Sequence, residues 1–512
     1  MKNRKFKKIL LISPPQTYPI DLKNEYQSYL PIGILCIAAV AEKVCFNVKI
    51  LDCLATEHEE IQGNNITFGQ PIDYISQEIV NFNPDIVGIS NPFTMFINNA
   101  NIVAKLVKSI NKKYIVILGG VSASIETLYM KLIKKPYYDI IIKGEGEKTV
   151  KELLENYSVL SNEIENLDKI KGIVYKSGNM FINNENRKFI EDLSSLPLPA
   201  LHLIDIEKTL KNKYYSRWRL NQLNKRSMPV FTSRGCPYNC VFCSVHTQVG
   251  YRHRTYSNEY VLEYVKQCKE KHGVMHFHFE DDNLTCNKIK AKQLMKKLCD
   301  LNITWDTPNG VRADTIDEEL LFLMVSSGLT SISVASESGN DMVLKNIIKK
   351  HMSTDSIVKV ASLANKYELP CNVFFVVGFP GEALENILDT IKFAKKLSKD
   401  YGTINNVFVA NPLPGTELEK TAVINNYMRQ NLSSEDYFKA IRINQTSIIE
   451  TKEFDKIKIF NLLKSELEYS DYSVHGTSIP MFWHDDDRTW NKVHKIFPKM
   501  SKEKTFVWEW RG

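Results

Sequence analysis

The sequence predicts an α/β protein in which a doubly wound parallel sheet is followed by a partial barrel. Over residues 1–165, short apolar runs alternate with segments of helical periodicity, as in a parallel sheet with helices on both faces. Over residues 223–420, six further strand and helix units predict a partial (β/α)6 barrel of the triosephosphate isomerase type. We expect a hairpin and a linker at residues 166–222, and a small, mainly helical cap or accessory region at residues 421–512.

The elements of the first unit follow from its apolar periodicity. Strands are expected at residues 8–13, 48–54, 85–90, 114–118 and 139–142, and helices at 33–43, 73–82, 98–111 and 127–134. Ligands of open α/β sheets bind at the carboxyl ends of the strands. The loops expected at that edge carry Pro14, Ser90, Asn91, Gly119, Gly120, Gly144, Glu145, Gly146 and Glu147.

The second unit has the same alternation of strands and helices. Its strands are expected at residues 228–232, 275–280, 304–309, 331–336, 372–377 and 406–410. Barrels of this type carry their chemistry at the carboxyl ends of the strands. A group of three cysteines directly follows the first of these strands, so we expect the reactive centre there.

Composition indicates a folded, cytoplasmic protein. Of the 512 residues, 43% are hydrophobic and 24% charged, which is typical of globular domains. No apolar run reaches the roughly 18 to 20 residues of a membrane helix, and the basic start MKNRKFKK lacks the long apolar stretch of a signal peptide. The net charge of +7 is spread over many lysines, so we expect neither a membrane nor a nucleic acid as partner.

The three clustered cysteines are Cys236, Cys240 and Cys243, in the segment RGCPYNCVFCSVH. Thiolates spaced C-x3-C-x2-C can ligate three irons of a cubane cluster and leave the fourth iron open for a substrate. A structural zinc site is the alternative, because His246 could supply a fourth ligand. The motif considered alone leaves both readings open.

CPYNCVFC at the start of a six-unit barrel resembles the radical S-adenosylmethionine (SAM) superfamily. Residues 5–420 resemble its cobalamin-binding branch, whose first domain is flavodoxin-like. The resemblance implies a [4Fe-4S] cluster on the three cysteines, SAM bound to the open iron, and a 5′-deoxyadenosyl radical made from it. It also implies cobalamin at the carboxyl edge of the first sheet, in contact with the loop residues named for that edge.

Further segments match those that bind SAM in this family. The positions concerned are Phe242, Glu280, Asp281, Asp282, Ser336, Glu337, Ser338, Gly378, Pro380, Gly381 and Pro414. One departure is that Glu280-Asp281-Asp282 replaces the family's usual Gly-Gly-Glu, so a solvated acidic turn is the alternative for these three residues. Arg312 has two alternative roles. Its guanidinium could bind a carboxylate or phosphate through a fork of donors, or it could form a structural ion pair.

The first unit lacks the D-x-H-x-x-G motif that supplies a histidine to cobalt in many cobalamin enzymes. His58 is the only histidine of the unit and lies outside any such motif. The resemblance therefore implies cobalt without a histidine ligand from this motif, and the alternative is a module that has lost cobalamin.

The function implied is methylation of an unactivated carbon, or of a phosphinate phosphorus, in a small molecule. The main rival is a non-methylating radical enzyme that forms or contracts a ring, and a sensor without turnover is a second. Methylthiolation of tRNA would need three more cluster cysteines, whereas those of the first unit, Cys36, Cys45 and Cys53, have the pattern of core thiols. We expect a monomer that receives electrons from a reductant such as flavodoxin or ferredoxin.

The chain ends in an aromatic tail with Trp483, Trp490, Trp508 and Trp510. A cap over the barrel mouth is one reading of this tail. The commoner reason for such residues is packing against the core.

Overall fold

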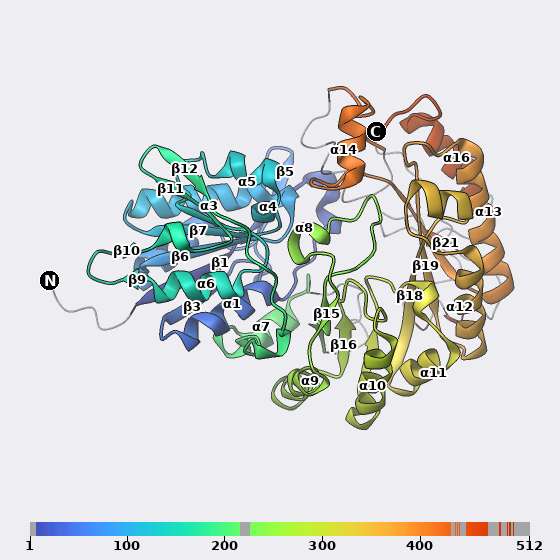
Figure 1. Ribbon diagram of the computed structural model, residues 1–512, viewed down its shortest axis with the longest axis horizontal. Coiled ribbons are helices and arrows are strands. Elements are labelled where there is room, and N and C mark those ends of the chain that lie inside the picture. Colours follow the sequence, from blue (N-terminus) through green and yellow to red (C-terminus); the bar gives the residue numbers. More distant parts are fainter. Residues whose placement is uncertain are drawn as a thin grey trace. The chain divides into compact units, whose positions relative to one another are not determined.

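The computed structural model describes residues 7–215, 226–431 and 447–468, together with positions 436, 438, 440, 481, 482, 489, 491, 492 and 495. The chain forms two compact units (Figure 1). Unit 1 comprises Met1–Asn224 and His246–Gly250, and unit 2 comprises Lys225–Val245 and Tyr251–Gly512. The four tryptophans of the expected aromatic tail lie outside the described residues.

Unit 1 is built on a seven-stranded sheet in the order β12-β11-β8-β7-β6-β1-β3. Its strands are β1 (Lys8–Ser13), β3 (Asn47–Asp52), β6 (Ile86–Asn91), β7 (Ile115–Gly120), β8 (Ile140–Ile142), β11 (Ile173–Ser177) and β12 (Met180–Asn183). The first five strands along the chain are parallel and have the flavodoxin-like order 2-1-3-4-5. The predicted doubly wound sheet is therefore confirmed.

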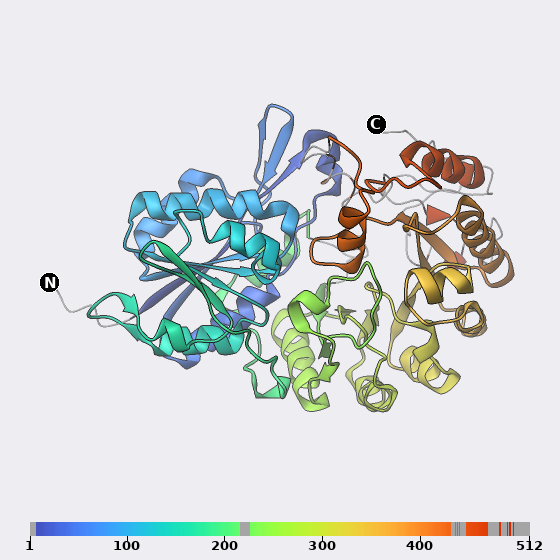
Figure 2. The ribbon, with the colours of Figure 1, turned by 45° about the horizontal axis from the view of Figure 1, so that its top comes forward.

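Helices cover both faces of this sheet, as Figure 2 shows. They are α1 (Ile32–Lys43), α2 (Ile72–Phe82), α3 (Ile97–Ile110), α4 (Val121–Ser124), α5 (Glu126–Leu132) and α6 (Glu147–Glu155). Helices α2, α3 and α5 contribute Ile75, Val103 and Leu132 to one buried cluster with the strand residues Leu10 and Val116. Burial of this apolar face is what fixes these helices on the sheet.

Two features of unit 1 differ from the sequence prediction. The hairpin β11–β12 pairs antiparallel with β8 and so continues the sheet, which means that the first domain does not end at residue 165. Strands β2 (Gln16–Pro19), β4 (Glu59–Gln62) and β5 (Asn65–Phe68) form a small antiparallel sheet that was not predicted. Strand β4 is exposed along its whole length, so it has no apolar alternation to reveal it.

Unit 2 is the predicted partial barrel. Six parallel strands follow one another in chain order: β13 (Ser227–Val230), β16 (His276–Phe279), β17 (Thr304–Asp306), β18 (Leu329–Glu337), β19 (Cys371–Val377) and β20 (Ile404–Val409). Helices α9 (Asn258–His272), α10 (Lys288–Leu298), α11 (Glu318–Ser326), α12 (Thr354–Lys366) and α13 (Leu384–Tyr401) lie along the outside of this curved sheet (Figure 1). After the barrel come α14 (Glu417–Ile424), α16 (Lys456–Glu468) and the short strand β21 (Met481–Phe482), which pairs antiparallel with β20.

Side-chain alternation assigns the two faces of the barrel strands. Trp305 of β17 donates from Nε1 to the carbonyl of Ser327 at the end of α11, 3.1 Å away, and its ring lies 4.6 Å from that of Phe279. These residues therefore face the helices. Because successive side chains of a strand point to opposite faces, His278 and Asp306 face the concave interior of the barrel.

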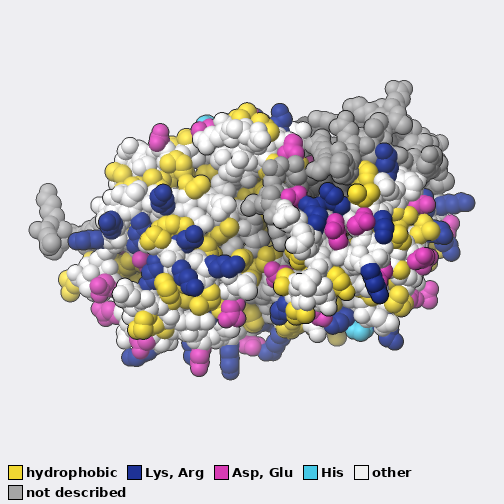
Figure 3. Space-filling model, turned by 90° about the horizontal axis from the view of Figure 1, so that it is seen from above, with side chains coloured by type: hydrophobic (Ala, Val, Ile, Leu, Met, Phe, Trp, Pro, Cys, Tyr) yellow, Lys and Arg dark blue, Asp and Glu magenta, His cyan; other side chains and the backbone are white. Residues whose placement is uncertain are grey.

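The charge on the surface is mixed. On the face seen in Figure 3, lysines and arginines stand among acidic and apolar side chains and do not form one basic patch. Among the described residues, no helix has both the length and the apolar character needed to cross a membrane.

Candidate functional site

The cysteine loop of unit 2 begins after β13 and is held by the acidic segment that follows β16. The Asp281 carboxylate accepts hydrogen bonds from the Thr232 N–H at 3.0 Å, from the Thr232 hydroxyl at 2.7 Å, and from the Ser233 hydroxyl. Asp282 Oδ2 accepts from the Gly235 N–H at 3.2 Å. The two carboxylates thus fix the chain immediately before the first cysteine.

The alternative of a solvated acidic turn fails for Asp281, which is only 2% exposed. Burial raises the pKa of Asp281 to about 6, against the opposing effect of its hydrogen bonds to Ser233 and Thr232. Glu280 lies beside it, and its carbonyl accepts from Asn309 Nδ2 at 2.8 Å. SAM binding by these acidic residues stays a prediction.

The three cysteines are half-buried. Burial raises the pKa of Cys240, and raises that of Cys243 to about 12, so both thiols must lose a proton when they bind metal. Asn283 Nδ2 lies 3.8 Å from Cys236 Sγ, within the range of a weak N–H to sulfur hydrogen bond.

Three thiolates spaced C-x3-C-x2-C on one loop suit a cubane, which places its ligands on different irons and leaves the fourth iron open. His246, the fourth ligand of the zinc alternative, begins α8 (His246–Val249).

A buried cation lies against the cysteine loop. The Arg312 guanidinium carbon is 3.5 Å from the centre of the Tyr238 ring, a stacking cation–π contact. Its Nε and Nη2 donate to the two carboxylate oxygens of Asp314, at 3.1 and 2.8 Å, and Nη2 also donates to the carbonyl of Lys350. The structural ion pair is therefore the reading that the structure supports for Arg312, since its fork is engaged by Asp314.

The predicted residues at the end of β18 are buried together. Glu337 has a left-handed backbone, with φ of 68°, at a bulge in the strand, and its Oε1 lies 2.7 Å from Lys350 Nζ. Ser338 Oγ lies 3.0 Å from Thr390 Oγ1, and Ser336 Oγ donates to the Ser338 carbonyl at 3.3 Å. The side chains of Lys350 and Thr390 were not identified from the sequence.

The turn after β19 combines predicted glycines with an acid that the sequence did not reveal. Gly378 and Gly381 have φ values of 88° and 91°, which favour glycine. Glu382 Oε2 accepts from the Gly378 and Phe379 N–H groups at 2.7 and 3.1 Å. Burial raises the pKa of Glu382 to about 7 against these bonds. The Phe242 ring lies 5.8 Å from that of Phe379, so this turn and the cysteine loop meet.

Two predicted prolines lie in these turns. Pro380 belongs to the turn after β19, and Pro414 to the turn after β20. In the second turn, the Gly415 N–H donates to Glu419 Oε2 at 2.7 Å, which ties the turn to the start of α14.

In unit 1, β1 and β6 are neighbours at the point where the strand order reverses, so Pro14, Ser90 and Asn91 lie at the switch point. Asn91 is buried and its side-chain oxygen accepts from the Ser122 hydroxyl. Asp52, at the end of β3, was missed. Burial raises its pKa to about 7, and Ser13 lies beside it as a hydrogen-bond partner.

The predicted glycines of unit 1 have different roles. A Cβ on Gly120, where φ is 98°, would lie 2.4 Å from the Asn91 carbonyl oxygen, and one on Gly146 would lie 3.0 Å from Ile37 Cδ1. These two glycines serve the protein's own packing. A Cβ on Gly119 would have nothing within 4 Å, so open space adjoins it at the carboxyl edge.

The remaining predicted residues of this edge hold the loop before α6. The Gly144 N–H donates to the Ser124 hydroxyl at 3.0 Å, and Glu145 Oε2 accepts from the Ile190 N–H at 2.7 Å. Glu147 is buried in the first turn of α6.

His58 and the three cysteines Cys36, Cys45 and Cys53 have the following places in unit 1. His58 is exposed, and its Nδ1 lies 3.0 Å from the carbonyl oxygen of Gly69, to which it donates. Cys53 is buried as expected and Cys36 is partly buried, but Cys45 is exposed and not a core thiol.

Comparison with known proteins agrees with the division of the chain into two units. Residues 230–394 match the radical SAM superfamily, and residues 22–154 match the B12 binding domain. An uncharacterized methyltransferase of Pyrococcus horikoshii, PH0819, is 32% identical over 83% of this chain and 85% of its own. The chain belongs to the cobalamin-binding radical SAM enzymes.

Two further comparisons extend this assignment. The cytidylyl-2-hydroxyethylphosphonate methyltransferase of Streptomyces wedmorensis is 28% identical to this radical SAM enzyme over 82% of the chain and 83% of its own. The structure of TsrM from Kitasatospora setae, a radical SAM methyltransferase, matches with a TM-score of 0.64 and covers 97% of this chain and 91% of its own. At 14% identity, this second match shows the fold alone.

The cofactors of this radical SAM enzyme are a [4Fe-4S] cluster, SAM and cobalamin. The residues present fit them. Three half-buried thiols in the spacing C-x3-C-x2-C would hold the cluster. The space beside Gly119, at the carboxyl edge of a flavodoxin-like sheet, suits a large cofactor lying against backbone.

Proposed function

We propose that this enzyme methylates an unactivated carbon, or a phosphinate phosphorus, of a small-molecule intermediate. The observation that carries the proposal is the match of more than four fifths of the chain to two proteins that are both named methyltransferases. One of them is named for a phosphonate, so phosphorus-containing organic acids are the first substrate class to test.

When bound, the cluster supplies the electron that cleaves SAM to a 5′-deoxyadenosyl radical, and cobalamin carries the methyl group to the substrate. The chain's own contribution is placement. Asp281 and Asp282 fix the start of the cysteine loop, and the stacked pair of Tyr238 and Arg312 fixes its middle. His58 is exposed and donates to a backbone carbonyl, which accords with a cobalt that has no histidine ligand from a D-x-H-x-x-G motif.

The test follows the methyl group. The full chain is reconstituted anaerobically with iron, sulfide and cobalamin, then given a chemical reductant, SAM with a trideuterated methyl group, and a panel of phosphonates and other small organic acids. We expect a product with the trideuteromethyl group, together with 5′-deoxyadenosine and S-adenosylhomocysteine. Cys240→Ala should give neither 5′-deoxyadenosine nor labelled product, whereas Cys299→Ala, which removes an exposed thiol outside the loop, should give both.

The rival predicts a different result. If a substrate is consumed and 5′-deoxyadenosine forms, but no S-adenosylhomocysteine forms and no label is transferred, the enzyme is a non-methylating one and the methyltransferase proposal is wrong.

We further propose that the enzyme is a cytoplasmic monomer that receives its electrons from flavodoxin or ferredoxin.

A further inference from the structure

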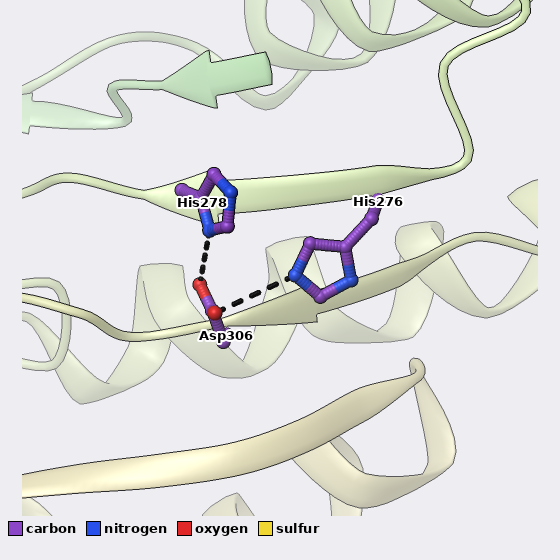
Figure 4. A group of neighbouring side chains, drawn as sticks. All are labelled: His276, His278 and Asp306. Atoms are coloured by element: carbon purple, nitrogen blue, oxygen red, sulfur yellow. Dashed lines mark hydrogen bonds and ion pairs between the residues drawn. The ribbon is translucent and has the colours of Figure 1, made fainter. Parts of the chain in front are cut away.

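A second set of metal-ligating side chains lies inside the barrel, apart from the cysteine loop. His276 and His278 are two positions apart on β16, and Asp306 lies on the neighbouring strand β17. All three are buried, with exposures of 1%, 5% and 6%. Figure 4 shows both imidazole rings turned toward the Asp306 carboxylate.

The strand register explains why these side chains meet. His278 is the register partner of Asp306, and His276 is the partner of Thr304. Residues two apart on a strand share a face, so the three potential ligands project from adjacent strands into the same layer. Among the described residues, this is the group of three His, Cys, Asp or Glu side chains whose ligand atoms all lie within 4.8 Å of one another.

The distances match the ligand shell of one transition-metal ion. His278 Nδ1 is 2.8 Å from Asp306 Oδ1, and His276 Nε2 is 3.5 Å from Asp306 Oδ2. With metal–ligand bonds of about 2.1 Å, ligand atoms lie about 3.0 Å apart at a right angle and about 3.4 Å apart at the tetrahedral angle. The 3.5 Å separation is close to the tetrahedral value, and the 2.8 Å separation, a hydrogen bond from His278 Nδ1 in the ion-free chain, is slightly shorter than the right-angle value.

Thr304 orients the His276 ring. Its hydroxyl lies 2.9 Å from His276 Nδ1 and 3.2 Å from the Met275 carbonyl oxygen, and it has one hydrogen to donate. When that hydrogen goes to the carbonyl, the hydroxyl accepts from His276 Nδ1–H. The lone pair of the neutral ring then lies on Nε2, 3.5 Å from Asp306 Oδ2, where a divalent cation could be bound by both.

We propose that His276 Nε2, His278 Nδ1 and Asp306 bind one divalent first-row transition-metal ion, with zinc as the type. Two imidazoles and a carboxylate are a ligand set of zinc and its neighbours, whereas magnesium and calcium take oxygen ligands. The Thr304 contact is the outer hydrogen bond that commonly fixes the tautomer of a metal-bound histidine. The ion would link β16 to β17 and leave a coordination position for water. This site does not depend on the proposed methyl transfer.

The experiment uses the full chain with its iron–sulfur cluster assembled first, so that iron occupies the cysteines. The protein is equilibrated with Zn2+, desalted, and measured for zinc and iron per chain and for the zinc ligand shell by X-ray absorption. We expect one zinc per chain, with nitrogen and oxygen ligands and no sulfur. His278→Gln and Asp306→Asn should each lose the zinc at unchanged iron content. The exposed-residue controls His351→Gln and Asp300→Asn should keep it.

Thr304→Val is the variant that leaves every ligand in place. We expect its zinc dissociation constant to rise about 10- to 100-fold, because the ring loses the group that fixes it. The proposal is overturned if the unaltered chain holds no zinc, which would mean that only a proton lies between the groups, or if the zinc shell contains sulfur. Unchanged zinc in folded Asp306→Asn would overturn it too. If the ligand variants do not fold, the zinc content of the unaltered chain and the zinc dissociation constant of Thr304→Val test the proposal.

Discussion

Removal of the positive charge from Lys350 should destabilise the barrel strongly. Lys350 Nζ lies 2.7 Å from Glu337 Oε1, and the two side chains are only 4% and 7% exposed. In Lys350→Met, the Glu337 carboxylate stays buried without its cation, which costs about 3 to 5 kcal/mol in comparable buried pairs. The double variant Glu337→Gln/Lys350→Met removes both charges, so most of this loss should be recovered.

Hydrogen exchange of peptides from β18 and β19 measures this cost in the barrel itself, because exchange reports the opening of the segment that is measured. The matched control is the exposed pair of Lys366 and Glu318, whose side chains are 61% and 53% exposed. There, Lys366→Met should change the opening free energy by less than about 1 kcal/mol. The reasoning fails if Lys350→Met is as mild as this control, or if the double variant is as unstable as the single one.

Three other predictions concern the site. Asp281→Asn should lower the iron bound per chain after reconstitution and cost roughly 1 to 3 kcal/mol in unfolding free energy, since three donors lose a charged acceptor; full iron loading would contradict it. Gly119→Ala should fold normally but bind cobalamin less tightly, whereas Gly120→Ala should unfold more easily because its Cβ meets the Asn91 carbonyl, as paired titration and thermal melts would show. Burial gives Glu382 a pKa of about 7 in the folded state, so it binds its proton more tightly there than in the unfolded chain; its contribution to stability is complete below about pH 4.5 and is lost as the pH rises through 7, roughly 3 kcal/mol in all. Glu382→Gln keeps an oxygen for both N–H donors, so its unfolding free energy should depend less on pH, and an unchanged dependence would refute the assignment.

The sequence predicted the repeated elements of both units well, because buried parallel strands and amphipathic helices have strong apolar periodicity. It predicted the cysteine loop from local spacing. It did not predict the antiparallel sheet that contains β4, since every residue of that strand is exposed. The boundary at residue 165 was wrong because hairpin β11–β12 pairs with β8, a contact that local polarity does not encode.

Roles that depend on contacts between distant residues were the hardest to foresee. Gly120 needs its conformation because of Asn91, which is far along the chain but adjacent in the sheet. Glu382 and Lys350 looked like ordinary charged residues and proved to be buried partners of the predicted turns. The segment HFHF of the second barrel strand did not reveal that His276 and His278 form a group of possible metal ligands. The third residue of that group, Asp306, lies on the next strand.

The central claim is that the loop of Cys236, Cys240 and Cys243 builds a cluster that cleaves SAM. The most direct test is 5′-deoxyadenosine formation by the anaerobically reconstituted, reduced chain, measured in parallel for the unaltered protein and for Cys240→Ala. The account predicts 5′-deoxyadenosine from the unaltered protein and none from the variant. Absence of the nucleoside from the reconstituted protein, or equal amounts from both proteins, would contradict it.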